Sequence, residues 1–366
     1  LRVPHQVRNH SCRIAATLWR QPIHFEARHR ELKKADRMIR QASPMGLVAI
    51  DTEQHAICIH KDLQDAASIK PAHKRPPGRR AGYRSNFMPS LRILLLPVLA
   101  LAACAAPKGH RVLTQGNGKL CILDHHGNLE WQMPWGGIHD LHVLPSGNIM
   151  LQQGAAKVVE IDRETQQVVW QYDSRTQNGN KGKRVEVHAF QPLPNGRVMI
   201  AESGPARIIE VDRTGALLSE TKMKVDRPHP HTDTRLVRKI ANDRYLVCHE
   251  GDGFVREYEQ DTGRVVWEYD VPMFGRETKG GHGLEAFGDK CFCALRLANG
   301  NTLIATGNGH SVIEVTTAGE VVWQLTQDEL EGVRLAWVTT LEVLANGNLV
   351  IGNCHAGPGQ PLLIEV

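Results

Sequence analysis

Two histidines and an arginine lie in irregular segments between strand-like repeats, where their side chains could perform acid–base chemistry. His231 and Arg235 belong to DRPHPHTDTR (226–235), and His282 belongs to the longer segment 272–293. Imidazole titrates near neutral pH and can act as a nucleophile or a general acid–base, whereas guanidinium binds anions through a fork of N–H donors. We therefore treat His231, His282 and Arg235 as the candidate catalytic residues.

Other polar residues in comparable positions are candidates for ligand binding. They are His139, His188, His229, Arg334 and Trp337. A group of imidazole and guanidinium side chains suits an anionic ligand, proton transfer or a metal ion. The sequence leaves a structural alternative open for each residue, in which the side chain hydrogen-bonds loop backbone around a water-filled channel.

The segment His229-Pro-His231 could also take part in a metal site. Neutral imidazole is a common metal ligand, and His139, His188 or His282 could complete the set. We expect Pro230 to keep this segment extended and so to place both rings on one side. A metal stays a possibility without an assigned ligand, because sequence does not show which side chains converge.

Several familiar sites are missing from the sequence. No GxSxG elbow, Walker loop, dinucleotide fingerprint or DxDxDG calcium loop occurs. The eight cysteines lack zinc-finger spacing, and a single residue separates Cys291 from Cys293. No basic stretch with interleaved aromatic residues indicates a nucleic-acid groove, so nucleic acid is not an expected partner.

The chain divides by charge near residue 87. Residues 1–87 hold 17 Lys/Arg and 7 Asp/Glu, a net charge of +10, which leaves the rest of the chain at −5. The first 87 residues show no sustained period of 2 or 3.6. We expect them to be a non-native or disordered extension, with Met88 as the true start.

Residues 88–104 have the layout of a secretory signal. A short cationic start, MPSLR, precedes the apolar run ILLLPVLALAA and then Leu101-Ala-Ala-Cys104. The last four residues resemble the lipobox of bacterial lipoproteins, and that resemblance implies cleavage before Cys104 and lipidation of its thiol. We therefore expect an exported protein, periplasmic or anchored by lipid in the cell envelope. Ordinary cleavage after a small residue is the alternative.

From residue 110 to residue 366 the sequence repeats. Five segments share an apolar strand, a turn, two further strands and a last strand that often carries tryptophan, and the first turn falls at Gly147, Gly196, Asp243, Gly300 and Gly347. The intervals of 49, 47, 57 and 47 residues are typical of propeller blades of four short strands. We expect the tryptophans to pack between blades. The glutamates repeated in the third strand, Glu160, Glu210, Glu257, Glu314 and Glu365, are interpreted as solvated or inter-blade contacts.

The fold predicted for 110–366 is an all-β, six-bladed propeller of four-stranded antiparallel blades. A partial unit precedes His139, four whole units follow, and the last unit stops at Val366 after its third strand. We expect the natural chain to continue beyond this truncated C-terminus, so that one blade joins strands from both ends. Seven blades is the alternative.

The blade pattern L-x-N-G-N-x-L-I…V-I-E-V-x-x-x-G-E-V-V-W resembles the pyrroloquinoline-quinone-type (quinoprotein-like) propeller repeat, and it is also similar to the repeat of six-bladed bacterial arylsulfotransferases. That superfamily includes quinone dehydrogenases and outer-membrane assembly scaffolds. Quinone dehydrogenases usually have eight blades, a calcium site and often adjacent cysteines, which this sequence lacks. The resemblance therefore implies the architecture and does not imply bound quinone.

Three functions follow as hypotheses. The first is a binding module of the cell envelope that recognises a protein, peptide, glycan or small anionic ligand. Its binding site would lie on the looped face, which we define as the face that carries segments 226–235, 272–293 and 326–337. The second is an arylsulfotransferase-like enzyme with a pocket histidine as nucleophile. The third is a quinone- or metal-dependent oxidoreductase. Convergence of the histidines and Arg235 in one closed pocket would favour an enzyme, and separate groups would favour a binding module.

Overall fold

The computed structural model describes residues 55–56, 110–116, 118–288 and 290–366. The predicted signal segment with Cys104, and most of the predicted extension 1–87, lie outside the described residues. Among the described residues, no helix is both long and apolar enough to cross a membrane.

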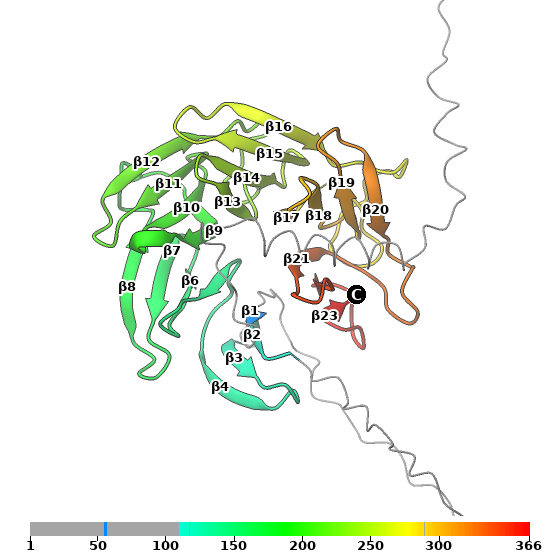
Figure 1. The fold of residues 1–366 in the computed structure, drawn as a ribbon, viewed down its shortest axis with the longest axis horizontal. Coiled ribbons are helices and arrows are strands. Elements are labelled where there is room, and N and C mark those ends of the chain that lie inside the picture. The colour runs from blue at the N-terminus through cyan, green and yellow to red at the C-terminus, as the bar shows by residue number, and fades with distance from the viewer. Residues whose placement is uncertain (1–54, 57–109, 117, 289) are drawn as a thin grey trace, which may run out of the picture.

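Six separate sheets follow one another along the chain (Figure 1). Blade 1 contains β1 (His55–Ala56), β2 (Val112–Gly116), β3 (Lys119–Leu123) and β4 (Leu129–Pro134). Blade 2 contains β5 (Leu141–Val143), β6 (Ile149–Gln153), β7 (Lys157–Ile161) and β8 (Val168–Asp173). Blade 3 contains β9 (Glu186–Pro192), β10 (Val198–Ser203), β11 (Arg207–Val211) and β12 (Leu217–Lys222).

The remaining sheets follow the same order. Blade 4 contains β13 (Val237–Ala241), β14 (Arg244–His249), β15 (Phe254–Glu259) and β16 (Val265–Asp270). Blade 5 contains β17 (Cys293–Arg296), β18 (Thr302–Ala305), β19 (Val312–Val315) and β20 (Val321–Leu325). Blade 6 has three strands, β21 (Val338–Val343), β22 (Leu349–Asn353) and β23 (Leu363–Glu365).

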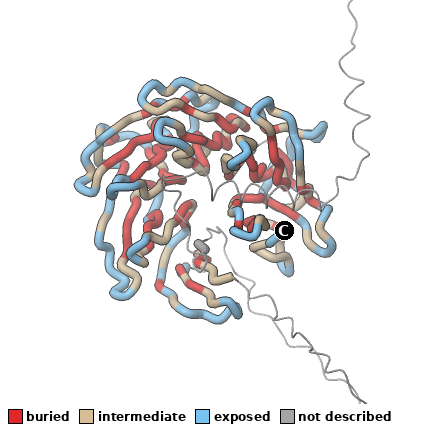
Figure 2. Tube along the Cα trace, viewed as in Figure 1, coloured by how far each residue is buried: buried red, intermediate tan, exposed pale blue. Residues whose placement is uncertain are grey.

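The blades stand around a common axis, and β9, β13, β17 and β21 lie nearest to it (Figure 1). Buried residues concentrate within the blades, while exposed residues gather at the outer turns (Figure 2). Each of the five large apolar clusters combines residues of two neighbouring blades, from blades 1 and 2 to blades 5 and 6, so the core consists of inter-blade layers. The predicted six-bladed propeller is confirmed.

Tight turns of positive φ explain the repeated glycines. Gly147, Gly300 and Gly347 have φ of 86°, 87° and 90°, in the left-handed region that suits residues without a Cβ. The turn before the outer strand of blade 2 has Gln166 where other blades have glycine. Gln166 nevertheless takes φ 59°, so the turn geometry persists without its preferred residue.

The tryptophans of the outer strands join adjacent blades, as predicted. The indole Nε1 of Trp131 donates to the carbonyl oxygen of Arg163 at 3.0 Å, and Trp170 and Trp267 make the equivalent bonds to the next blade at 2.9 and 3.0 Å. Each acceptor lies in the turn between the third and fourth strands of that next blade. The tryptophan therefore both buries apolar surface and fixes the spacing between two blades.

Third-strand glutamates add a second inter-blade link. The carboxylate of Glu160 accepts from Arg213 of blade 3, and that of Glu257 accepts from Arg296 of blade 5 at 2.7 Å. Glu210 accepts from the Tyr245 hydroxyl of blade 4 at 2.7 Å. These contacts confirm the interpretation of the repeated glutamates as structural.

The two ends of the propeller meet without sharing a sheet. A nitrogen of the His110 ring, just before β2, lies 2.8 Å from a Glu365 oxygen of β23. Among the described strands no sheet combines strands from both ends of the chain, and the predicted shared blade stays a prediction. The first position of blade 1 is taken by β1, which pairs with β2 in parallel, whereas every other described strand pair is antiparallel.

Candidate functional site

Three histidines from three consecutive blades come together. His139 precedes β5, His188 lies within β9, and His231 precedes β13. The ring centroids of His139 and His188 are 4.5 Å apart, those of His188 and His231 are 5.3 Å apart, and those of His139 and His231 are 6.3 Å apart. We call these residues, with Glu186, the histidine cluster.

Glu186 connects two of the rings. Its Oε2 atom lies 2.7 Å from Nδ1 of His231 and 3.3 Å from Nε2 of His188. Its Oε1 atom accepts from the exposed guanidinium of Arg184 at 3.2 Å. The contacts with His188 and His231 hold the pKa of Glu186 well below its usual range, so this group is a carboxylate at any physiological pH.

The protonation of His188 is set by its surroundings. Burial, with a contribution from the positive charge of Arg235, lowers the pKa of His188, so its ring is neutral near pH 7. A neutral ring has one N–H, yet Nδ1 faces the Thr234 carbonyl oxygen at 2.9 Å and Nε2 faces Glu186. One of these two contacts therefore joins two acceptors. The ring nitrogens of His188 thus lie between a backbone carbonyl oxygen and the Glu186 carboxylate.

Close packing of two loops brings His231 to Glu186. Gly204, in the turn after β10, has φ 92°, and a Cβ there would lie 2.2 Å from the carbonyl oxygen of Arg184. The buried carboxylate of Asp233 accepts from the backbone N–H of Gly204 at 2.8 Å and from that of His229 at 2.6 Å. Glycine and aspartate thus clamp the segment of His231 against the segment of Glu186.

The backbone around Pro230 is not extended as expected. The N–H groups of Thr232 and Asp233 donate to the His229 carbonyl oxygen at 2.8 and 2.9 Å, which closes a turn over 229–233. The His231 N–H donates to Nδ1 of His229 at 3.2 Å. Pro230 therefore occupies the second position of the turn, where its fixed φ is favoured, and the chain bends directly after His229. Within this segment, the ring of His231 faces Glu186 and that of His229 caps the turn.

A buried ion pair holds the same three blades together next to the cluster. Asp140 follows His139, and its two oxygens accept from Nη1 and Nη2 of Arg238 in β13 at 2.7 and 2.8 Å. Phe190 of β9 donates its N–H to the same carboxylate at 3.1 Å. Although burial opposes ionisation, Arg238 and His142 keep the pKa of Asp140 well below its usual range. These contacts join blades 2, 3 and 4 directly beside the histidine cluster.

Arg235 is buried beside the cluster. Its Nε donates to Glu250, and its guanidinium lies 5.1 Å from the ring centroid of Phe292. Nη1 is buried without a hydrogen-bond partner among the described residues. Its influence on His188 shows that its charge reaches the cluster.

His282 belongs to a second aromatic group on the looped face. Its ring centroid lies 4.5 Å from that of Trp337 and 5.3 Å from that of His355. Trp337 has φ 52°, an unusual conformation for a bulky residue, and its N–H donates to Nδ1 of His310 at 3.0 Å. His310 in turn lies 2.7 Å from the carbonyl oxygen of Ala286 through Nε2. His310 therefore holds Trp337 in place.

The other candidates have structural partners. Arg334 is exposed, and its Nε donates to Asp328 at 2.9 Å. His249, which the sequence suggests is a turn-shaping residue, is buried between the Asp233 carbonyl oxygen at 2.7 Å and the Tyr258 hydroxyl at 2.9 Å. That interpretation is confirmed. His355, interpreted in the same way, joins the group of His282 and Trp337.

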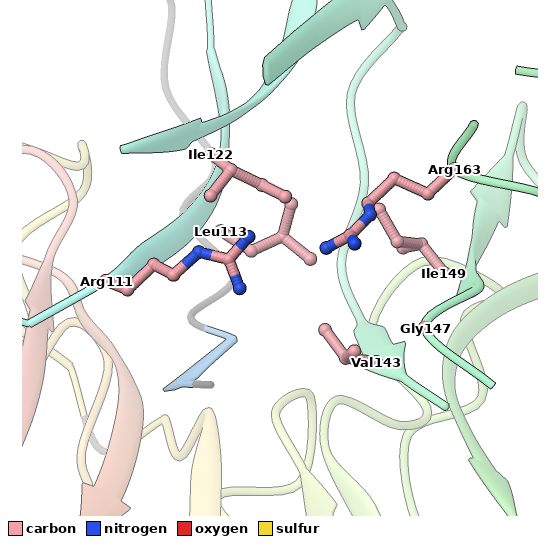
Figure 3. A pocket seen from close by; sticks show the side chains of 7 residues that line it. All are labelled: Arg111, Leu113, Ile122, Val143, Gly147, Ile149 and Arg163. Atoms are coloured by element: carbon pink, nitrogen blue, oxygen red, sulfur yellow. The ribbon is translucent and has the colours of Figure 1, made fainter. Parts of the chain in front are cut away.

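A small hollow lies apart from the candidate residues (Figure 3). It sits between blades 1 and 2, and its lining is mostly apolar: Arg111, Leu113, Ile122, Val143, Gly147, Ile149 and Arg163. None of these residues belongs to the histidine cluster or to the group of Trp337. The hollow is therefore not part of the candidate functional site.

Sequence analysis missed Glu186. It precedes His188 by two residues on β9, and the two side chains lie together although the pairing of β9 with β10 shifts register at His188. Glu186 lies on a first strand, whereas the repeated glutamates lie on third strands. A glutamate outside the repeat was the sequence signal that could have identified it. Gly204 and Asp233 were also missed, because only tertiary contacts reveal their role.

The family model described as outer membrane protein assembly factor BamB matches residues 116–357. The chain belongs to this family. The resemblance to quinoprotein-like propellers is thereby confirmed, and the match covers nearly the whole described propeller of this BamB-type chain. No match is found among curated proteins.

A solved structure supports the fold of the BamB-type chain. A protein of unknown function from Bacteroides caccae is 23% identical, covers 68% of this chain and 86% of its own, and superposes with a TM-score of 0.54. BamB from Moraxella catarrhalis is 13% identical, covers 67% of this chain and 66% of its own, and has a TM-score of 0.39. At these identities the first likeness shows the fold alone.

Proposed function

We propose that this chain is an exported module of the cell envelope that binds a partner through its looped face. The observation that carries the proposal is the histidine cluster, in which side chains of three blades meet beside the buried Arg235. Such a cluster at the mouth of a repeat scaffold supplies hydrogen-bond donors, acceptors and charge for recognition. Family membership and the signal-like segment 88–104 support an envelope location.

The separation of the candidate residues into two groups favours binding over sulfate transfer. His231 lies with His139, His188 and Glu186, whereas His282 lies with Trp337 and His355. An enzyme of the arylsulfotransferase type would need its nucleophile and its anion clamp in one place. Arg235, the candidate clamp, is instead paired with Glu250.

Photo-cross-linking in intact cells tests this function. A photo-reactive amino acid replaces Glu277 or Arg334, which are exposed on the looped face. Matched controls carry it in place of Glu164 or Asn346, exposed in turns between third and fourth or first and second strands, on the opposite face. We expect discrete adducts from the looped face only. Equal adducts from both faces, or adducts from the control face alone, would contradict the proposal.

A further inference from the structure

We propose that Glu186, His188 and His231 bind a divalent transition-metal ion of the zinc class. One ligand atom from each residue lies within 4.8 Å of the other two. Two imidazoles and one carboxylate are a ligand set that suits zinc and related first-row ions, and that leaves a coordination position open. No other group of three such residues in the described part of the chain meets the same distance condition.

The distances suit a small ion after a minor adjustment. Ligand atoms at about 2.0–2.1 Å from a tetrahedral zinc ion lie roughly 3.3 Å from one another. The separation between Nε2 of His188 and Oε2 of Glu186 is 3.3 Å. The separation between Nδ1 of His231 and the same oxygen is 2.7 Å, so this pair must open by roughly half an ångström to admit the ion. His231 is half exposed, which leaves its ring room to move.

The surroundings of His188 are those of a ligand. When Nδ1–H donates to the Thr234 carbonyl oxygen, the proton is fixed on that nitrogen and the lone pair of Nε2 points toward Glu186. Metal-bound histidines usually donate their second nitrogen to a carbonyl or carboxylate in this way. The ion would replace a contact between two acceptors with two coordinate bonds.

Nearby charges do not oppose the ion strongly. The guanidinium of Arg235 is paired with Glu250, which offsets its charge. Arg184 contacts the other oxygen of Glu186 and is exposed to solvent. Water or a donor atom of a bound partner can fill the fourth position. His139 is a further candidate, because its ring centroid lies 4.5 Å from that of His188.

The metal site belongs to the looped face on which the proposed function rests, but it requires only these three side chains. Absence of metal binding with intact cross-linking would overturn the metal site and leave partner binding in place. Metal binding without cross-links would overturn partner binding and leave the metal site in place.

Metal titration of the purified full chain tests the site. Zn²⁺ is added in competition with a chromophoric chelator, and Co²⁺ is added separately so that its visible absorption reports the coordination geometry. We compare the wild-type protein with Glu186→Gln and with His231→Ala, whose exposed ring can be removed without opening the core. The matched control is His282→Ala, which removes another exposed histidine of the looped face.

We expect one Zn²⁺ per chain and a four-coordinate Co²⁺ spectrum. Because loss of an outer-shell partner already lowers metal affinity by about 10–100-fold, loss of a ligand should lower it at least ~100-fold. His282→Ala should retain the wild-type affinity. Failure to bind Zn²⁺, or equal affinity in Glu186→Gln, His231→Ala and the control, would overturn the proposal.

Discussion

The histidines of the propeller differ in the partners of their ring nitrogens. His249 and His310 each use both ring nitrogens on neighbouring groups within the protein. His188 shares one nitrogen with the backbone and presents the other to Glu186. Residue type alone therefore does not indicate the partners of each ring, which only the structure shows.

Sequence reasoning identified most of the cluster at the residue scale. His139, His188 and His231 were candidates because they interrupt the repeat near the start of first strands. Glu186 was missed because a single carboxylate has no meaning until its partners are known. A turn at Pro230 replaces the expected extended backbone, and Nδ1 of His229 accepts from the His231 N–H.

Replacement of His249 by glutamine should weaken the pH dependence of stability. Burial lowers the pKa of His249 to about 4, from an ordinary value of 6.5. Between these values the unfolded chain binds one more proton than the folded chain, so folding stability falls as pH falls. From pH 7 to pH 5 the wild-type protein should lose about 2 kcal/mol more than His249→Gln.

Urea denaturation at several pH values measures this difference. His188 and His310, whose pKa values are also lowered, contribute equally to both proteins and cancel in the comparison. Exposed His126→Gln is the control and should keep the wild-type slope. A slope in His249→Gln equal to that of the wild type would show that His249 is not held neutral by the fold.

At the scale of elements, the blade repeat is carried by turns and inter-blade contacts. Alternation and glycine spacing predicted the four-strand units and the inter-blade tryptophans, because these features recur in most blades. The contacts that join loops across blades do not recur. Asp233, for example, accepts from Gly204, which lies 29 residues away on the preceding blade. No local pattern could indicate such a contact.

The close approach at Gly204 leads to a stability prediction. An alanine Cβ would meet the Arg184 carbonyl oxygen at 2.2 Å in a backbone of φ 92°. Strain from φ and from overpacking should together cost about 3 kcal/mol of folding free energy. Gly154→Ala occupies the equivalent turn of blade 2, has φ 62°, and meets nothing within 4 Å, so it should cost only about 1 kcal/mol.

Denaturant unfolding of the two variants measures the excess cost at Gly204. About 2 kcal/mol should remain for Gly204→Ala, because its Cβ meets the Arg184 carbonyl oxygen and its φ of 92° is less favourable to alanine than the 62° of Gly154. Equal destabilisation of both variants would mean that the loops of Arg184 and His231 do not meet as the structure shows.

At the scale of the whole molecule, six blades form one ring with its candidate residues on the looped face. The period of the repeat, the Asn-Gly turns and the tryptophan strand were sufficient to predict the architecture. They could not predict how the first blade is completed, because β1 is a two-residue strand that lies more than fifty residues before β2. The division of charge at residue 87 predicts an N-terminal segment distinct from the propeller, whereas β1 of that segment pairs with β2 in blade 1.

The envelope location can be tested through Cys104. If Leu101-Ala-Ala-Cys104 is a lipobox, then cells expressing the chain from Met88 should incorporate labelled fatty acid into it. Cys104→Ser should abolish the label and retain the uncleaved precursor. Buried Cys354→Ser is the matched control and should be labelled like the wild type. Equal labelling of Cys104→Ser, or no label in the wild type, would contradict lipidation at this residue.

The central claim is that a partner is recognised by the histidine cluster on the looped face. Its most direct test is the cross-linking yield from a photo-reactive amino acid in place of Glu277, measured in cells with an intact cluster and with Glu186→Gln combined with His231→Ala. Both proteins must be present at equal levels. We predict that the double substitution removes most of the adduct, and an unchanged yield would contradict the claim.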